Sequence, residues 1–186
     1  MMDKLNLVLG GGNPRQSSFL LLMDEINFNS CKDTIEWIIE ANFAEEKPEA
    51  LNLIICSPGG NLSAAFALID VMRGSAIPVH TIGIGEIASA GLLIFLAGKK
   101  GKRVLTPNTS VLSHQYSWGS MGKEHELFAT VKEFDLTTKK MMAHYKKFTI
   151  LNEVEIRELL LPPHDVWLSS KDALKYGICD IVKDLN

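Results

Sequence analysis

The sequence predicts an α/β fold in which helices surround a mostly parallel sheet. Short apolar runs of strand length alternate along the chain with longer segments that carry apolar residues at helical spacing. This alternation is typical of β-α units. Their strands run parallel because each helix brings the chain back to the end of the sheet at which the previous strand began. With 186 residues, of which 46% are hydrophobic, the chain can bury the core of one domain.

The first half of the chain predicts two strands that are each followed by a helix. Residues 19–23 and 51–56 are short and almost wholly apolar, which indicates strands that are buried on both faces. Ser30 is the expected N-cap of the first helix. Asn61 is the expected cap of the second helix, over residues 62–73.

The middle and the end of the chain add four short strands and two helices. Glycines and prolines separate these segments and mark the turns between them. The expected strands are residues 79–84, 103–105, 110–112 and 178–182, and the expected helices run from the small-residue segment 88–91 to near Gly98 and over residues 170–177.

One long charged segment, residues 123–148, predicts a helix that extends beyond the domain. Its apolar residues recur about every 3.5 positions, which is typical of a helix that pairs with another helix. They are Leu127, Val131, Phe134, Met141, Tyr145 and Phe148. Such a helix is about 39 Å long, more than a domain of this size can cover with its own core. We therefore expect a protruding helix that contacts another subunit; the alternative is two helices packed on the body.

Composition and charge exclude several classes of protein. A net charge of -3 gives no sign of binding to nucleic acid or to a membrane surface. No apolar run reaches the length of about 18 residues that a membrane-spanning helix needs. The three cysteines form no CxxC pair, which argues against a disulfide framework or a zinc site and fits a reducing compartment. No metal or cofactor is expected, and the basic residues 99–103 predict a surface turn that caps a helix.

Two small-residue motifs indicate where chemistry could take place. The run Ser-Pro-Gly-Gly at residues 57–60 follows a predicted strand, so its backbone N–H groups could hold an oxyanion; an ordinary strand–helix turn is the alternative. Ser89 stands between two alanines at the predicted start of a helix, where the N–H of Ala90 and the helix dipole favour negative charge. Tight helix packing is the alternative explanation for these small residues.

A nucleophilic serine needs a base and an orienting carboxylate. Of the five histidines, His114 follows a predicted strand and precedes a glycine-containing loop, which puts it slightly ahead of His164 in another loop. The other three are expected in the core or in solvent on the long helix: His80, His125 and His144. Asp165 precedes an apolar stretch that would hold it partly buried; a surface turn is the alternative.

Taken in order along the chain, these motifs resemble those of the Clp protease proteolytic subunit family. The resemblance covers residue 19 to the end, with the motifs in the family's order and approximate spacing. They are SPGG at 57–60, GEIASAG at 85–91, GKKGKR at 98–103, PN at 107–108, HQ at 114–115, DVWLS at 165–169 and ALKYGICD at 173–180.

The resemblance implies an α/β fold of the crotonase-like Clp type, with stacked β-α units and a protruding handle helix. It implies one peptidase domain over residues 19–186, with the handle at about 123–148 and residues 1–18 as a flexible or pore-lining arm. The same resemblance assigns roles to individual residues: Ser89 as nucleophile, His114 as base, Asp165 as carboxylate, and Gly60 and Ala90 as the oxyanion-hole amides.

The implied function is that of a serine endopeptidase that hydrolyses unfolded polypeptides through an acyl-enzyme in the cytoplasm. In this family, subunits form heptameric rings, and two rings meet through their handles as a tetradecamer that encloses a chamber. An AAA+ unfoldase, the Clp ATPase, is the implied partner. The alternatives are a non-catalytic ring subunit and a crotonase-type acyl-CoA enzyme.

Several positions depart from the family's pattern. Ala90 follows the serine where the family often has methionine, but only the backbone N–H of this residue concerns the oxyanion. His164 stands where the family often has an arginine that helps register the subunits. Asn52 and Ile54 replace aromatic residues that help form the docking pocket for the unfoldase.

Overall fold

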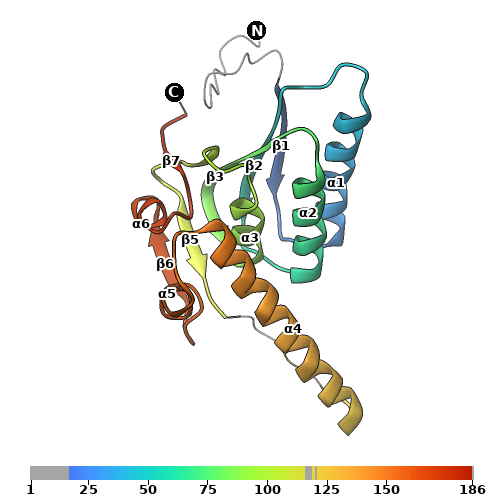
Figure 1. Cartoon of the computed structure of the whole chain (residues 1–186), viewed down its shortest axis with the longest axis vertical. Coiled ribbons are helices and arrows are strands. Elements are labelled where there is room, and N and C mark those ends of the chain that lie inside the picture. Colours follow the sequence, from blue (N-terminus) through green and yellow to red (C-terminus); the bar gives the residue numbers. More distant parts are fainter. Residues whose placement is uncertain (1–16, 116–118, 120, 186) are drawn as a thin grey trace.

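A computed structural model of the chain describes residues 17–115, 119 and 121–185, and over them it has the predicted α/β architecture (Figure 1). The strands are β1 (Ser17–Met23), β2 (Ala50–Ser57), β3 (Val79–Ala88), β4 (Arg103–Leu105), β5 (Ser110–Ser113), β6 (Val166–Ser169) and β7 (Ile181–Val182). The helices are α1 (Phe28–Phe43), α2 (Leu62–Gly74), α3 (Ala90–Leu96), α4 (Glu124–Phe148), α5 (Glu153–Leu159) and α6 (Ser170–Lys175).

All of these strands belong to one sheet, whose main path runs β1-β2-β3-β4-β7. Neighbours along this path pair in parallel, so the predicted mostly parallel sheet is confirmed. β3 also pairs in parallel with β5 through its second half. Among the described strands only β5 and β6 pair antiparallel.

Strand β3 is longer than its glycines predict. Gly85 has φ +61° inside the strand, and the register with β2 shifts between Ile55 and Ser57. The glycine therefore accompanies a bulge rather than the end of the strand. Beyond the bulge β3 continues to Ala88, so the next residue, Ser89, lies at the carboxyl end of the sheet.

The prediction that both early strands are buried on both faces is wrong for β1. Leu22 is buried, but Phe19, Leu21 and Met23 are exposed, Met23 by 64%. β1 is an edge strand that pairs only with β2 within the described chain, and α1 packs against it. Because successive side chains of a strand point to opposite faces, every second residue of β1 lies on the uncovered face.

The N-cap of α1 is Asn27, whose side chain accepts hydrogen bonds from the N–H groups of Asn29 and Ser30. The hydroxyl of Ser30 accepts a hydrogen bond from the N–H of Asn27, which completes a capping box. Ser30 as the cap was therefore a wrong prediction, because serine can also serve as the returning partner of a capping box. Asn61 caps α2 as predicted, by accepting from the N–H of Ala64.

Helix α3 is the most buried of the described helices, since all of its residues are buried. It packs against α2, α4 and the strands β2, β3 and β5. This confirms the predicted apolar helix after the small-residue segment. Ser89 directly precedes α3 and is therefore attached to the centre of the core.

The long segment forms one continuous helix, α4, so the alternative of two helices is excluded. At the standard rise its 25 residues span about 37 Å. Its second half packs on the body and buries Met141, Met142 and Tyr145, whereas its first half projects from the domain (Figure 1). The projecting half exposes apolar side chains: Leu127, Phe128, Val131 and Leu136.

The C-terminal region differs from the prediction in three details. Helix α5 was not expected; it begins with a capping box between Asn152 and Glu155. The cap of α6 is Ser169, which accepts from the N–H of Asp172, and Gly177 follows the helix with φ +70°. The last strand, β7, covers only Ile181–Val182 of the predicted residues 178–182. Ile178 is buried but lies before this strand.

The basic cluster is not a simple surface turn. Arg103 is 2% exposed and forms a salt bridge of 2.6 Å with Asp180, while its guanidinium also donates to the carbonyl of Phe148. The partner carboxylate lies far along the chain and could not be assigned from the local sequence. The buried pair instead fastens β4 to the C-terminal segment and to the end of α4.

The expected arm, residues 1–18, lies almost entirely outside the described residues, and Ser17 and Ser18 are the first residues of β1. Within the described chain, no helix combines the length and the apolar character that crossing a membrane requires.

Candidate active site

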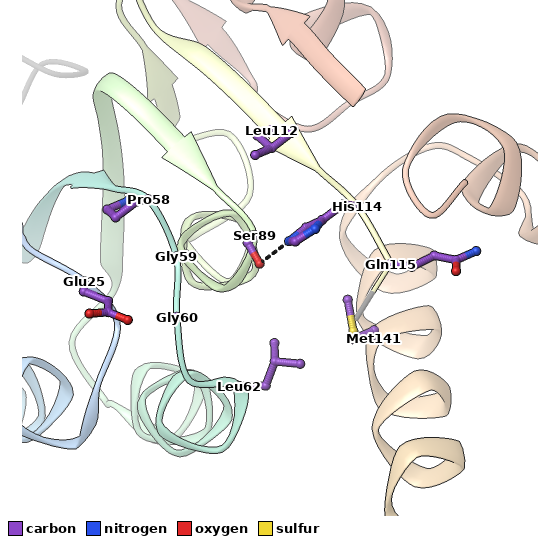
Figure 2. A pocket seen from close by; sticks show the side chains of 10 residues that line it. All are labelled: Glu25, Pro58, Gly59, Gly60, Leu62, Ser89, Leu112, His114, Gln115 and Met141. Carbon is purple, nitrogen blue, oxygen red and sulfur yellow. Dashed lines mark hydrogen bonds between the residues drawn. The ribbon is translucent and has the colours of Figure 1, made fainter. Parts of the chain in front are cut away.

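A pocket of about 410 Å³ opens at the carboxyl ends of β1, β2, β3 and β5 (Figure 2). The residues after these strands meet there, as ligand-binding residues commonly do in parallel sheets. The pocket is lined by Glu25, Pro58, Gly59, Gly60, Leu62, Ser89, Leu112, His114, Gln115 and Met141.

Ser89 is held in an unusual backbone conformation. Its φ of 51° and ψ of -119° make it the only residue other than glycine with a positive φ in the described chain. Its N–H donates to the carbonyl of Leu112, which ties the turn between β3 and α3 to β5. Strained residues of this kind persist only where their surroundings fix them. Here the buried α3 on one side and β3 on the other supply that support.

The two glycines after β2 allow the chain to pass close to Ser89. A Cβ on Gly59 would lie 2.7 Å from the Cβ of Ser89, and a Cβ on Gly60 would lie 2.3 Å from the carbonyl oxygen of Ile26. Both residues have a positive φ, +97° and +141°. The Ser57 hydroxyl accepts a hydrogen bond from the N–H of Gly59 and fixes the turn. Only glycine satisfies both the backbone angles and the space at these positions.

Two backbone N–H groups remain available beside Ser89. The bridge to Ile26 uses the carbonyl of Gly59 and the N–H of Asn61, so it leaves the N–H of the exposed Gly60 uncommitted. Ala90 is the first residue of α3, and a helix has no carbonyl partner for its first N–H groups. These donors match the positions that the sequence predicts for an oxyanion hole.

His114 contacts Ser89 directly. The distance from its Nε2 to the Ser89 Oγ is 2.7 Å, as drawn in Figure 2. His114 follows β5, and β5 runs parallel beside the end of β3. The adjacent Ser113 is buried and donates to the carbonyl of Leu160, so Tyr145 must donate its hydroxyl to Ser113, at 3.0 Å. Burial raises the pKa of Tyr145 to about 12, which keeps this hydroxyl protonated.

Asp165 is the outermost of the three predicted side chains. Its Oδ1 lies 3.5 Å from the Nδ1 of His114, longer than a standard N–H···O hydrogen bond. The side chain of Asp165 is 63% exposed, so the prediction of partial burial is wrong. The reason is that Asp165 precedes the edge strand β6, whose apolar Leu168 faces inward while Trp167 stays exposed.

The remaining histidines do not reach the pocket. His164 and His125 are exposed, the latter as predicted. His80 is half-buried and pairs with Asn52 at 3.3 Å. His144 was expected in solvent, but it is buried: its Nε2 donates to the carbonyl of Leu93, and its ring packs against Phe66 and Phe148.

Two of the three cysteines are poorly suited to act as nucleophiles. Cys31 and Cys179 are buried, and burial raises the pKa of each thiol to about 11, which disfavours the reactive thiolate. Nowhere in the described residues do three His, Cys, Asp or Glu side chains gather as potential metal ligands.

Sequence reasoning missed half of the pocket lining. Glu25, Leu62, Leu112, Gln115 and Met141 were not singled out, although they surround the same space. Four of them could have been suspected, because each lies close to the carboxyl end of a parallel strand or directly after a helix cap. Residues at these places lie close together in a parallel sheet. Met141 could not, since it comes from α4, whose packing on the body depends on the tertiary fold.

The arrangement is suited to nucleophilic catalysis. A hydroxyl that is hydrogen-bonded to a neutral imidazole can lose its proton as it attacks a carbonyl carbon. The uncommitted N–H groups of Gly60 and Ala90 could then stabilise the oxygen that becomes negative.

Comparison with known proteins agrees with this chemistry. The family model described as Clp protease matches residues 15–185. An ATP-dependent Clp protease proteolytic subunit of Deinococcus radiodurans is 34% identical over 142 residues, covering 76% of this chain and 68% of the relative. Subunit 2 of Treponema pallidum is 33% identical over 162 residues, covering 86% and 78%. Subunit 1 of Leifsonia xyli is 34% identical over 141 residues, covering 76% and 71%.

The family model spans nearly all of the described residues, and it includes the strands, the pocket and α4. The fold is thus the crotonase-like Clp fold that the motifs imply, with α4 as its handle helix. The chain belongs to the Clp protease family and is a serine endopeptidase of the Clp type.

Proposed function

We propose that Ser89, His114 and Asp165 are the catalytic residues and that they cleave peptide bonds through an acyl-enzyme. The observation that carries this assignment is the 2.7 Å contact between Ser89 Oγ and His114 Nε2 inside the pocket. As Oγ bonds to the substrate carbonyl carbon, its proton passes to Nε2. The carbonyl oxygen becomes negative and accepts hydrogen bonds from the N–H groups of Gly60 and Ala90.

Collapse of this intermediate breaks the C–N bond, and the proton on His114 passes to the leaving amine. The acyl group stays on Ser89 as an ester. His114 then takes a proton from a water molecule, whose oxygen attacks the ester carbon. The bond from this carbon to Ser89 Oγ breaks, His114 returns the proton to Oγ, and the carboxylic acid product leaves and ionises to the carboxylate. Throughout these steps Asp165 keeps the Nδ1–H tautomer of His114 and stabilises the imidazolium.

The same family membership supports a proposed assembly. The exposed apolar residues on the projecting half of α4 are suited to pair with another copy, which would join heptameric rings into a tetradecamer. The curated relatives are named ATP-dependent, and on this basis we propose that an AAA+ unfoldase of the Clp ATPase type delivers unfolded polypeptides in the cytoplasm. Asn52 replaces one of the aromatic residues that help form the family's docking pocket for the unfoldase. It is buried beside His80 and donates to the carbonyl of Ser18, so an unfoldase would dock here on a surface without that aromatic side chain.

The catalytic assignment is tested with a short fluorogenic peptide and the full chain. We expect Ser89→Ala to lower kcat/KM by about 10⁴-fold or more, because the nucleophile acts as a unit with its base. Ser110→Ala is the matched control, since Ser110 is exposed on β5 outside the pocket and should keep full activity. Near-normal cleavage by Ser89→Ala would overturn the assignment.

A fluorophosphonate probe separates a peptidase from a non-catalytic ring subunit. The probe should label Ser89 in the wild-type chain, and mass spectrometry should find no label on Ser89 in His114→Ala, because the serine then lacks its base. Absence of label on a correctly assembled wild-type particle would favour the non-catalytic role.

The assembly is tested by the mass of the particle in solution. We expect a tetradecamer for the wild-type chain and single rings when Phe128 and Val131 are both replaced by serine. An unchanged particle mass would show that the exposed residues of α4 do not join the rings.

A further inference from the structure

The two walls of the active-site pocket differ in chemical character. Leu62 and Met141 line one wall on the side of His114, and both are apolar. Figure 2 shows Glu25 on the opposite side of the segment that contains Gly59 and Gly60. The carboxylate in the lining of the pocket therefore lies on the side away from these two apolar side chains.

The position of Glu25 is fixed by its backbone. Its N–H donates to the Asp24 carboxylate at 2.7 Å, and its carbonyl accepts from the Ser30 hydroxyl at 2.8 Å. The next residue, Ile26, forms the bridge to Gly60. As a result the Glu25 Cγ lies 3.0 Å from the place where a Cβ on Gly60 would be.

The carboxylate of Glu25 has no partner within the residues that the structure describes. It forms no ion pair and no side-chain hydrogen bond there, and the residue is exposed to solvent in the pocket. A carboxylate without a cation beside it favours a positively charged group that comes within a few ångströms. No lysine or arginine lines the pocket, so the cation would have to come from the substrate.

We propose that Glu25 gives the peptidase a preference for substrates with lysine or arginine next to the scissile bond. This inference rests on the proposed function, because it places the substrate carbonyl between Ser89 and the N–H of Gly60. Neighbouring residues of an extended peptide rise by about 3.3 Å and point to opposite sides. Glu25 lies directly beside Gly60, so it can reach a side chain adjacent to the bond that is cleaved.

The expected preference is modest. Because Glu25 is exposed, water and salt weaken its attraction for a cation, and we expect a lysine to be favoured over a glutamine by about fivefold in kcat/KM. A glutamate at the same place should be disfavoured by about a further fivefold, because like charges repel. Both ratios should shrink as the ionic strength rises.

Cleavage of a pool of unstructured peptides, with the cut sites mapped by mass spectrometry, tests the preference on both sides of the scissile bond at once. The wild-type chain should enrich lysine and arginine at one flanking position. Glu25→Gln should remove this enrichment, and Glu25→Lys should replace it with glutamate and aspartate. The matched control is Glu45→Gln, which removes an exposed carboxylate outside the pocket and should leave the enrichment intact.

Failure of this inference can be distinguished from failure of the proposed function. Equal cleavage of basic and acidic sites by the wild-type chain, or a basic preference that survives Glu25→Lys, would overturn the role of Glu25 alone. Loss of all peptide cleavage would instead contradict the proposed function. In that case, fluorescence anisotropy still tests the inference by measuring the affinity of the Ser89→Ala chain for labelled lysine and glutamate peptides. Equal affinities would contradict the inference. A preference for the lysine peptide that Glu25→Lys removes would support it.

Discussion

The candidate active site consists of two halves that are positioned in different ways. Ser89 and the glycines that face it are fixed by the ends of buried strands, by α3 and by a backbone bridge to Ile26. Asp165 lies on the segment between α5 and the edge strand β6, with 63% of its side chain exposed. Its contact with His114 is 3.5 Å, against 2.7 Å between His114 and Ser89.

This difference indicates which part of the site tolerates change. The half with Ser89 and the facing glycines, which we call the nucleophile half, is held by backbone contacts in a packed core. Substitutions there should therefore cause large losses of activity. The carboxylate half depends on a solvent-exposed side chain, whose interactions are weaker and partly replaced by water.

Among the substitutions that compare the two halves, Gly60→Ala is expected to have the largest effect. The added methyl group would lie 2.3 Å from the carbonyl oxygen of Ile26, at a φ of +141° that alanine resists. The segment must move, and the displaced N–H should cost about 10³-fold in kcat/KM for a fluorogenic peptide. Gly74→Ala in α2 is the control, because a Cβ there meets nothing within 4 Å. Near-normal activity of Gly60→Ala would mean that this half is not rigid.

His144, which is hydrogen-bonded to α3 behind Ser89, should make the free energy of unfolding depend on pH in the acid range. Burial lowers the pKa of His144 from 6.5 to about 4, and nearby Arg73 and Lys147 add to the lowering. Between these values the unfolded chain binds a proton that the folded chain does not. Stability is therefore fully present above about pH 6.5 and decreases as the pH falls to about 4, by up to roughly 3 kcal/mol.

Denaturant unfolding followed by circular dichroism, at a constant protein concentration and from about pH 7.5 to about 4.5, measures this decrease. His144→Gln keeps a donor for the carbonyl of Leu93 but cannot titrate, so its curve should be flatter than that of the wild-type chain. His125→Gln, on the exposed half of the same helix, should reproduce the wild-type curve. Identical slopes for all three proteins would contradict the role of His144.

Asp165→Asn should reduce activity less than Gly60→Ala does. In a buried triad the corresponding change costs about 10⁴-fold. Here the carboxylate is exposed and 3.5 Å from the imidazole, so we expect a loss of about 50-fold in kcat with little change in KM. Asp135→Asn, on the exposed face of α4, is the control. A loss as large as that of Gly60→Ala would remove the contrast between the halves.

The signals for the backbone geometry around Ser89 are local, and the sequence therefore predicts this part of the fold. The turn is specified within a few positions by the glycines directly after a strand and by the small residues around Ser89. The strand–helix order and the long α4 follow from apolar spacing in the same way. The resemblance to a family then selects among histidines that local reasoning leaves nearly equal.

The errors concern contacts between distant segments. His144 stands near lysines in the sequence, and it is buried against Leu93 of α3 and Phe66 of α2, which are distant along the chain. Arg103 belongs to a basic run, and its partner Asp180 is near the other end of the chain. The exposure of Asp165 depends on β6 being an edge strand, which no local pattern states.

The smallest expected effect concerns the connection between the two halves. Tyr145 on α4 donates to Ser113, and Ser113 donates to the carbonyl of Leu160, just before the segment that carries Asp165. Tyr145→Phe removes the first of these hydrogen bonds, and Ser113 keeps the second. We therefore expect about 1 kcal/mol of lost stability and a change in kcat below about threefold. Denaturant unfolding and peptide kinetics measure the two quantities, with the half-buried Tyr176→Phe as the control.

The size of the kinetic effect decides how the halves communicate. If Tyr145→Phe lowers kcat tenfold or more while the particle stays assembled, the hydroxyl helps to hold His114 against Asp165, and α4 is then a positioning element rather than a packing element alone. The pH dependence of kcat/KM distinguishes these cases, because a displaced carboxylate changes the position of the profile along the pH axis, whereas a packing defect lowers the whole profile evenly. An unshifted profile with a small decrease would leave His114 positioned mainly by β5, on the side of the nucleophile.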